Sequence, residues 1–458
     1  MEEGSIEDGE KISRETEVAP ALIAIHPLEK SVVVAVGSEL RIFDLQGDRS
    51  ITLLGDNSGG PLHTDAIRAV CFGATGRVFA SAGDDKLVKI WNTESWQCTR
   101  TVSSEKRVSA VAISHNGAFL TFADKFGVVW VVDLEKDDEK AAPLLAHYCS
   151  IITSLDFSPD GQFIASADRD FKIRITVFPK KPLDGAHEIQ SFCLGHKELL
   201  SACGYIGSFV SCLAFVHTSE YPQWFLLSGS GDSTVRMWDF ISGTLLDTCE
   251  VGAQAELVES NGEECPRVVT DICASSDGSL VAVAIQRQVL QHFGAFLIIF
   301  GCVVLTCLLF RYCSLHGVML MCCNFSARTL SVSKVVTVGE SFVPTRLGMS
   351  CSAEHLWMVT GASNLPSSGP LAHVRVVSLC QKGLDPTVLE DGAVPGGKKL
   401  LEKLQGSLTA VKQVDALVAA AEAVKMAMRN LLIKREYSME KRELRKKSRN
   451  DRKLKQIL

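Results

Sequence analysis

Hydrophobic and polar residues alternate along most of this chain in short runs, which is the period of β-strands. In three places a strand rich in small residues is followed by a polar turn containing aspartate and then by a second alternating strand, at 79–92, 164–177 and 226–239. These segments align without gaps. Further strands end in glycine-containing turns at 70–76, 155–161 and 273–279. The pattern predicts antiparallel hairpins in an internal repeat.

Four polar or aromatic positions recur with the repeat. A histidine opens each unit, and a serine precedes the aspartate by four residues. The predicted structural sets are His63, Ser81, Asp85 and Trp91; His196, Ser228, Asp232 and Trp238; and His147, Ser166 and Asp170, with Thr176 in place of tryptophan. Serine, histidine and aspartate also form hydrolytic triads, but three copies in register favour a structural role.

The pattern resembles the WD-repeat family of β-propellers, in which such residues form one hydrogen-bond chain within a blade. A four-stranded blade cannot bury both faces alone, so blades stack in a ring. Weaker repeats at 31–45, 118–134, 271–286 and 356–379 bring the predicted number to seven. We therefore expect an all-β, seven-bladed WD-repeat propeller over residues 18–380, with a C-terminal amphipathic and basic α-helical tail.

Two segments interrupt the repeats, at 199–208 and 287–313. The second contains eighteen residues without a formal charge, 293–310, which is long enough to span a membrane. A span would place two parts of one propeller on opposite sides of a bilayer, and a hydrophobic insertion packed on the protein is another interpretation. We favour aberrant insertions, such as a retained intron, because removing 287–313 rejoins two strands as a hairpin.

Signs of catalysis are absent from the sequence. It contains no phosphate-binding loop, no dinucleotide-binding glycine motif and no HExxH zinc motif. Its 16 cysteines are scattered, and the acidic N-terminus does not resemble a secretory signal, so reduced thiols are expected. We predict no catalytic residues, no metal site, no cofactor and no small-molecule substrate.

The most distinctive motif lies in the fourth repeat, where ADRD-x-KIR is followed by SFCLGH between residues 157 and 198. It resembles the non-catalytic WD-repeat subunit of the eukaryotic tRNA (guanine-N7)-methyltransferase. In that family the propeller binds and stabilises a catalytic methyltransferase subunit and helps present tRNA for methylation of a variable-loop guanine. The resemblance implies a heterodimer, tRNA binding and a nuclear location, with a membrane not expected. A generic WD-repeat scaffold, in ribosome assembly or ubiquitin ligation, is the alternative.

The resemblance also implies partner-binding residues, namely Arg169, Lys172 and Arg174. It implies that Arg174 pairs with an acidic residue of the catalytic partner. A solvated or intrachain role is the alternative, because Lys89 and Arg236 occupy equivalent positions in other repeats.

Charge is distributed unevenly along the chain. The net charge is −6, yet residues 434–458 carry eleven basic and four acidic residues. We expect a disordered acidic N-terminus over 1–17, a linker over 381–397 and a helical basic tail over 398–458, in which apolar residues recur every three or four positions from Leu400 to Val418. The tail is interpreted either as a solvated helix with a nuclear-localisation signal or as a contact to tRNA phosphates. The candidate tRNA-binding residues are Lys441, Arg442, Arg445, Lys446, Lys447 and Arg449.

Overall fold

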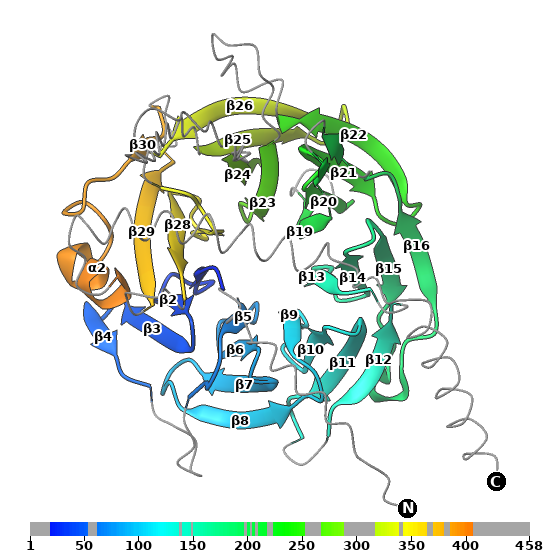
Figure 1. Cartoon of the computed structure of the whole chain (residues 1–458), viewed down its shortest axis with the longest axis horizontal. Helices are drawn as coiled ribbons and strands as arrows, with labels where there is room; N and C mark the ends of the chain where they lie inside the picture. Colours follow the sequence, from blue (N-terminus) through cyan, green and yellow to red (C-terminus); the bar gives the residue numbers. More distant parts are fainter. Residues whose placement is uncertain are drawn as a thin grey trace, which may run out of the picture.

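The protein forms a ring of seven four-stranded antiparallel sheets, seen down the ring axis in Figure 1. The structure is a computed structural model. It describes residues 19–53, 62–136, 140–147, 150–196, 199–201, 204–206, 209–217, 223–251, 267–287, 317–338, 342–363, 370–379 and 385–405. The predicted disordered N-terminus lies outside these residues.

Each sheet is one blade, and its strands a to d follow one another in the chain from the centre of the ring to the rim. Blades 1 to 3 contain β1 (Leu22–Ile25), β2 (Ser31–Val36), β3 (Glu39–Asp44), β4 (Arg49–Ile51), β5 (Ile67–Phe72), β6 (Val78–Gly83), β7 (Leu87–Asn92), β8 (Cys98–Ser103), β9 (Val108–Ile113), β10 (Phe119–Asp124), β11 (Val128–Asp133) and β12 (Ala142–Ala146). Blades 4 and 5 contain β13 (Ile152–Phe157), β14 (Phe163–Asp168), β15 (Ile173–Val177), β16 (Ile189–Cys193), β19 (Val210–Val216), β20 (Phe225–Ser230), β21 (Thr234–Asp239) and β22 (Thr244–Glu250). Blades 6 and 7 contain β23 (Arg267–Ala274), β24 (Leu280–Arg287), β25 (Gly317–Asn324), β26 (Thr329–Thr337), β27 (Arg346–Met349), β28 (His355–Ala362), β29 (Leu371–Ser378) and β30 (Thr387–Val388).

The predicted seven-bladed, all-β fold is confirmed. The predicted boundary at residue 380 is wrong, because the outer strand of blade 7, β30, lies inside the expected linker. This strand has only two residues, too few to show an alternating pattern.

Apolar side chains fill the spaces between neighbouring blades. Between blades 4 and 5, for example, Ile173 and Ile175 pack with Leu226 and Trp238, all fully buried. Each blade is apolar on both of its faces, so it has to pack against a neighbouring blade on either side. This requirement closes the ring.

Hydroxyl side chains also join neighbouring blades near the centre. On four inner strands a β-bulge leaves one hydroxyl residue unpaired, and its oxygen lies 2.5–3.3 Å from a carbonyl oxygen of the next blade. These residues are Ser109, Thr153, Ser211 and Thr270. Thr345, at the start of β27, makes the equivalent bond to Ala21 of blade 1, 2.7 Å long.

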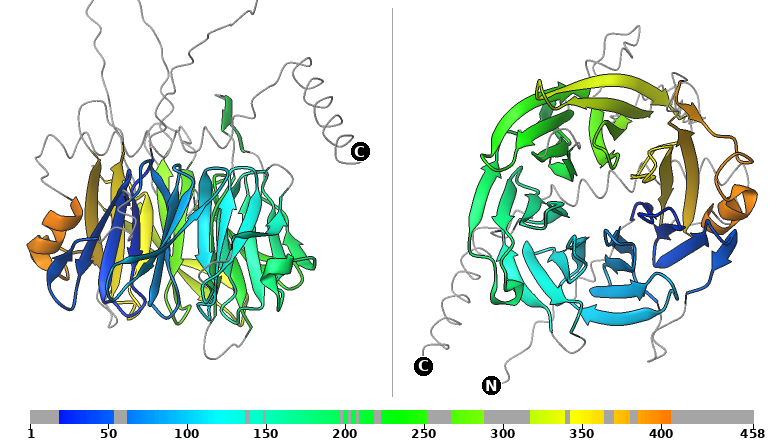
Figure 2. Two further views of the ribbon diagram at one scale, coloured as in Figure 1. Left: turned by 90° about the horizontal axis from the view of Figure 1, so that it is seen from below. Right: turned by 180° about the vertical axis from the view of Figure 1, so that it is seen from behind.

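Blades 1 and 7 meet without sharing a strand, and helix α2 (Gly397–Gln405) covers their junction on the outer rim (Figure 2). Its buried face consists of Leu400, Leu401 and Leu404, which pack with residues of both blades. Arg41 of β3 donates to the carbonyl oxygens of Leu404 and Gln405 at 3.1 and 3.2 Å. The first residues of the predicted tail therefore pack on the ring and hold blades 1 and 7 together. The rest of the tail lies outside the described residues.

Both interrupting segments fall between strands of the ring, except that Arg287, the first residue of the second segment, is the last residue of β24 and pairs with Arg267. Residues 199–201 (β17) and 204–206 (β18) pair in a small hairpin that belongs to no blade. The strands on either side of the second interruption, β24 and β25, pair directly from Leu280 with Cys322 to Ile285 with Gly317. They form the predicted hairpin of blade 6. Within the described residues, no helix has the length and apolar character needed to cross a membrane.

Candidate functional site

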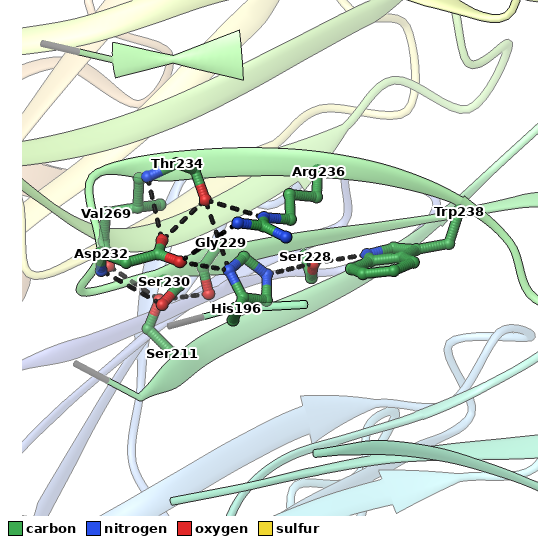
Figure 3. Close-up of polar contacts among 10 residues, drawn as sticks. All are labelled: His196, Ser211, Ser228, Gly229, Ser230, Asp232, Thr234, Arg236, Trp238 and Val269. Carbon is green, nitrogen blue, oxygen red and sulfur yellow. Dashed lines mark hydrogen bonds and ion pairs between the residues drawn. The ribbon is translucent and has the colours of Figure 1, made fainter. Parts of the chain in front are cut away.

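The recurring polar residues form closed networks inside blades 2 and 5. In blade 2, His63 contacts Asp85 through Nδ1 at 2.7 Å and Ser81 through Nε2 at 2.8 Å, and the Trp91 indole donates to Ser81 at 3.0 Å. Blade 5 repeats this arrangement with His196, Asp232, Ser228 and Trp238 at 2.8–2.9 Å (Figure 3).

Blade 4 differs from the prediction in its acidic residue. His147 contacts Ser166 as expected, but its Nδ1 meets Asp168 rather than Asp170, at 2.9 Å. Asp168 also accepts backbone hydrogen bonds from Asp170 and Lys172, which hold the turn. Asp168 is the last residue of β14, so in this blade the strand end, not the turn that follows it, contacts the histidine. The alignment of Asp170 with Asp85 and Asp232 was therefore misleading.

These networks are structural rather than catalytic. In blade 2 the side chains of His63 and Asp85 are 0% and 1% exposed, so no substrate can reach them. Burial lowers the pKa of His196, and the hydrogen bond and charge of Asp232 only partly offset this. Burial acts to raise the pKa of Asp85, but hydrogen bonds from His63, Leu87 and Thr64 outweigh it and hold that pKa below its usual range. A buried imidazole that is hydrogen-bonded on both ring nitrogens suits a structural role.

Two of the predicted partner-binding residues, Lys172 and Arg174, lie just before and within β15. Ile173 and Ile175 are buried against blade 5, while Lys172 is exposed and Arg174 half-buried. This alternation agrees with the sequence interpretation. Arg174 donates from Nε to Thr176 Oγ1 at 3.1 Å and from Nη1 to the Ala146 carbonyl oxygen of blade 3 at 3.1 Å.

Arg174 has the same strand register as Lys89 and Arg236 but different surroundings. All three lie opposite the recurring serines of their blades, Ser166, Ser81 and Ser228. Lys89 and Arg236 are buried, and Arg236 Nη2 lies 3.7 Å from Asp232 of its own blade. In blade 4, Thr176 replaces the tryptophan of the other networks, and its hydroxyl accepts a hydrogen bond from Arg174 instead. The replacement of tryptophan by Thr176 thus contributes to the orientation of the Arg174 side chain.

Arg169 lies in the turn between β14 and β15. Its Nε is 3.9 Å from Asp170 Oδ1, and its side chain is largely buried. The structure therefore places Arg169, Lys172 and Arg174 on one blade, with Lys172 the most exposed of the three.

A cationic cluster on blades 2 and 3 was not predicted. Buried Asp84 accepts from Arg68 at 2.6–2.7 Å, and its other oxygen lies 3.8 Å from Arg107 and 3.7 Å from Lys125. In an antiparallel blade the b–c turns and the connections between blades emerge on the same face of the ring, so this cluster shares its face with Arg169 and Lys172. The signal was present in the sequence: an aspartate at the b–c turn is followed closely by a basic residue in Asp84–Lys86, Asp124–Lys125 and Asp168–Arg169.

Other predicted features lie partly beyond the described residues. All six candidate tRNA-binding residues of the tail, Lys441 to Arg449, are outside them. Among the described residues, no group of histidine, cysteine, aspartate and glutamate is arranged to hold a metal ion.

Comparison with known families agrees with the fold and adds a specific relationship. A model of the G-beta WD repeat matches residues 61–92, and a model described as the tRNA methyltransferase TRM82 WD40 domain matches residues 135–295. Residues 135–295 thus resemble a TRM82-type WD40 domain. The matched range contains blade 4 and Arg174, so the resemblance inferred from ADRD-x-KIR is confirmed.

Curated relatives of the TRM82-type domain are named as non-catalytic subunits of tRNA (guanine-N(7)-)-methyltransferase. The WDR4 protein of Mus musculus is 34% identical over 45% of this chain and 46% of its own length. The WDR4 protein of Homo sapiens is 31% identical over 51% of this chain and 52% of its own length. The wdr4 protein of Dictyostelium discoideum is 25% identical over 60% of this chain and 58% of its own length. The chain spans about half the length of the curated relatives it matches.

Solved structures support the propeller fold alone. U3-55K has a TM-score of 0.55 and 18% identity, and the alignment covers 75% of this chain and 89% of that one. The β-propeller domain of Cps50 (Swd1) from Myceliophteria_thermophila has a TM-score of 0.52 and 12% identity, with coverage of 79% and 96%.

Proposed function

We propose that this protein is a non-catalytic scaffold subunit that binds and stabilises the catalytic subunit of tRNA (guanine-N7)-methyltransferase. The observation that carries the proposal is the TRM82-type match over the blades that include Arg174. The names of the relatives support it, as do the buried hydrogen-bond networks, which stabilise the individual blades.

Arg174 is the centre of the proposed partner contact. Its guanidinium is held by Thr176 and by the Ala146 carbonyl oxygen, and it sits half-buried at the boundary of blades 3 and 4. A held guanidinium loses little side-chain entropy when a carboxylate binds it, and its planar fork suits a bidentate pair. We expect the partner to supply an aspartate or glutamate here. Lys172 and Arg169 would add positive potential around it.

The substitution Arg174→Leu tests this contact. Leaving the partner carboxylate without its counter-ion is expected to cost about 2–5 kcal/mol of binding free energy. Co-purification with the catalytic subunit should therefore be lost while the melting temperature of the propeller stays unchanged. Arg49→Leu is the control, because Arg49 is a mostly exposed arginine of blade 1 that pairs only with Asp44 among its described contacts. Equal co-purification of both variants would contradict the assignment.

We further propose that the cationic cluster and the basic tail contact tRNA phosphates. Three cations gather around one buried carboxylate at Asp84, and the side chains of Arg107 and Lys125 are 41% and 29% exposed. Phosphate contacts release counterions, so the affinity should depend on salt and little on sequence. The variant Arg107→Ala/Lys125→Ala should weaken tRNA binding by the assembled complex and flatten the salt dependence, by roughly one to two in slope. Lys399→Ala, on α2 beside Asp48, should leave both unchanged.

Reconstitution tests the function as a whole. Methylation of a variable-loop guanine by the catalytic subunit is expected to rise when this protein is added, and the protein alone should transfer no methyl group. A catalytic subunit that is equally active and equally stable without this chain would refute the proposal. A nuclear location is proposed with it, and imaging of the tagged full-length chain tests that point.

A further inference from the structure

Exposed apolar side chains gather on one part of the rim. Among the described residues seven large hydrophobic side chains are exposed, and five of them lie on blades 4 and 5. We call these five the rim patch: Ile189, Phe192, Leu194, Ile241 and Leu245. The other two, Leu28 and Phe126, belong to blades 1 and 3.

The two blades that carry the rim patch are joined at the rim. The side chain of Gln190 in β16 donates to the Ile241 carbonyl oxygen at 3.1 Å, and Ser191 bonds to the carbonyl oxygen of Phe240. Gly243 lies so close to β16 that a Cβ atom there would be 2.4 Å from the Phe192 carbonyl oxygen. The turn between β21 and β22, with Ile241, is thus fixed against the outer strand that presents Ile189 and Phe192. The elements that carry the patch are therefore held together at the blade boundary.

The outer strands of the other blades are different. Helix α2 packs against blade 1 near β4, and the 3₁₀ turn η1 (Pro182–Asp184) lies along β12, where Ala186 donates to Leu144. In β8, the exposed positions are Thr99, Thr101 and Ser103. Large exposed apolar groups concentrated in one place on a soluble domain mark an interaction site.

The register of blade 4 connects the patch to Arg174. Phe192 is the direct cross-strand partner of Arg174, and Ile189 is the partner of Thr176. Directly paired residues project to the same face of a sheet, so a guanidinium and an exposed phenyl ring stand side by side. This face of blade 4 therefore presents exposed apolar side chains beside the guanidinium of Arg174.

We propose that the rim patch is the hydrophobic half of the docking surface for the catalytic methyltransferase subunit, whose matching segment carries apolar side chains next to a carboxylate. This inference rests on the proposed function and names the surface that it uses. The continuity with Arg174 selects this occupant: a second copy of this chain, docked about a twofold axis through the patch, would bring two cationic blade-4 strands together. An apolar centre with a charged pair at its border is the usual anatomy of a protein interface.

A pair of matched double variants tests the inference. Phe192→Ser/Leu194→Ser removes two patch residues that are 44% and 59% exposed, and Phe126→Ser/Leu28→Ser removes two that are 56% and 59% exposed elsewhere on the ring. Binding of the purified full-length chain to the catalytic subunit is measured by calorimetry, without tRNA. The patch variant should bind at least about tenfold more weakly, since central apolar residues dominate interface energies, and the control should bind like the wild type. Both should keep the wild-type melting temperature, because the substituted side chains are exposed.

The outcomes separate this inference from the proposed function. If the wild-type chain binds the catalytic subunit and the patch variant binds equally well, the rim patch assignment is overturned while the proposed function stands. If the wild-type chain does not bind, both fail. Sedimentation of each variant alone detects the remaining occupant: a change of self-association in the patch variant, with unchanged binding to the catalytic subunit, overturns the inference in favour of a second copy.

Discussion

At the scale of single residues, the histidine networks show how an internal chain of hydrogen bonds fixes the tautomer of a buried ring. Trp238 donates to Ser228, which leaves the serine proton for His196 Nε2, so the Nδ1 proton of His196 points to Asp232. The direction of these bonds follows from the donors available and agrees with the lowered pKa of His196. Removing the middle member breaks two bonds.

Ser228→Ala is expected to lower the free energy of unfolding by about 1–3 kcal/mol, because buried nitrogen atoms of Trp238 and His196 then lose their partner. Urea unfolding followed by tryptophan fluorescence measures the change. Ser103→Ala, at an exposed position of β8, is the control and should change little. A loss of stability as small as that of Ser103→Ala would contradict the structural role of the network.

The stability of blade 7 should depend on pH through His373. Burial, together with the nearby charge of Arg375, lowers the pKa of His373 to about 4 from the ordinary 6.5, although Asp391 acts in the opposite direction. Between about pH 4 and 6.5 this histidine is protonated in the unfolded chain but mostly unprotonated in the folded chain. Stability is therefore complete above about pH 6.5 and falls as the pH drops towards 4.

The matching measurement compares wild type with His373→Gln between pH 7.5 and 4.5. The wild type should lose more stability, by at most about 1.4 kcal/mol for each pH unit below 6.5. His187→Gln, on an exposed loop, controls for the loss of an imidazole and should retain the wild-type slope. Parallel curves for wild type and His373→Gln would rule out the contribution.

The role of a single residue could be predicted from the sequence only where its position recurs in several repeats. Two of the three networks were predicted member by member, because the spacings from serine to aspartate and from aspartate to tryptophan recur. Asp168 was missed because the alignment favoured Asp170, and only the path of the turn decides which carboxylate faces His147. The cluster at Asp84 was missed since Arg68, Arg107 and Lys125 are brought together by neighbouring blades, not by spacing along the chain.

At the scale of elements, the hairpin of blade 6 shows what the ring requires of the segment between its strands. Ile285 and Gly317 are paired directly, so the outermost pair of the hairpin is complete on either side of the interruption. Removing 287–313 leaves four residues between them, Gln286, Ser314, Leu315 and His316. Four-residue loops are common hairpin connections.

A chain lacking 199–208 and 287–313 should accordingly fold better than the full-length chain. We expect a higher soluble yield and a higher melting temperature, because the eighteen uncharged residues 293–310 no longer have to be accommodated. Differential scanning calorimetry of both proteins, expressed in parallel, makes the comparison. Equal yield and equal melting temperature would refute the idea that these segments are foreign to the fold.

At the scale of the whole molecule, closure of the ring relies on side chains and on α2. Ala19, Ala21 and Thr345 exchange hydrogen bonds with the facing blade, and Leu400, Leu401 and Leu404 cover the same junction from outside. From sequence, α2 was interpreted as the start of a tail for tRNA or nuclear import. Helical periodicity revealed the buried face of the helix but not its partner, since that partner is formed by the two ends of the repeat array.

Leu400→Ala should open this junction preferentially. Leu400 is fully buried, so the cavity is expected to cost about 2–5 kcal/mol. Hydrogen exchange should accelerate in β1 and β29, on either side of the junction, more than in β14 and β20 across the ring. Leu28→Ala, an exposed leucine of blade 1, is the control. Uniform acceleration in all blades would contradict a local role for α2.

Because every blade is made of four consecutive strands, no blade is divided between the two ends of the repeat array. A circular permutant with its ends moved to a different inter-blade connection would cut no sheet. By the same logic, duplication or loss of one complete blade alters the circumference of the propeller and leaves the internal bonding of each remaining blade as it was.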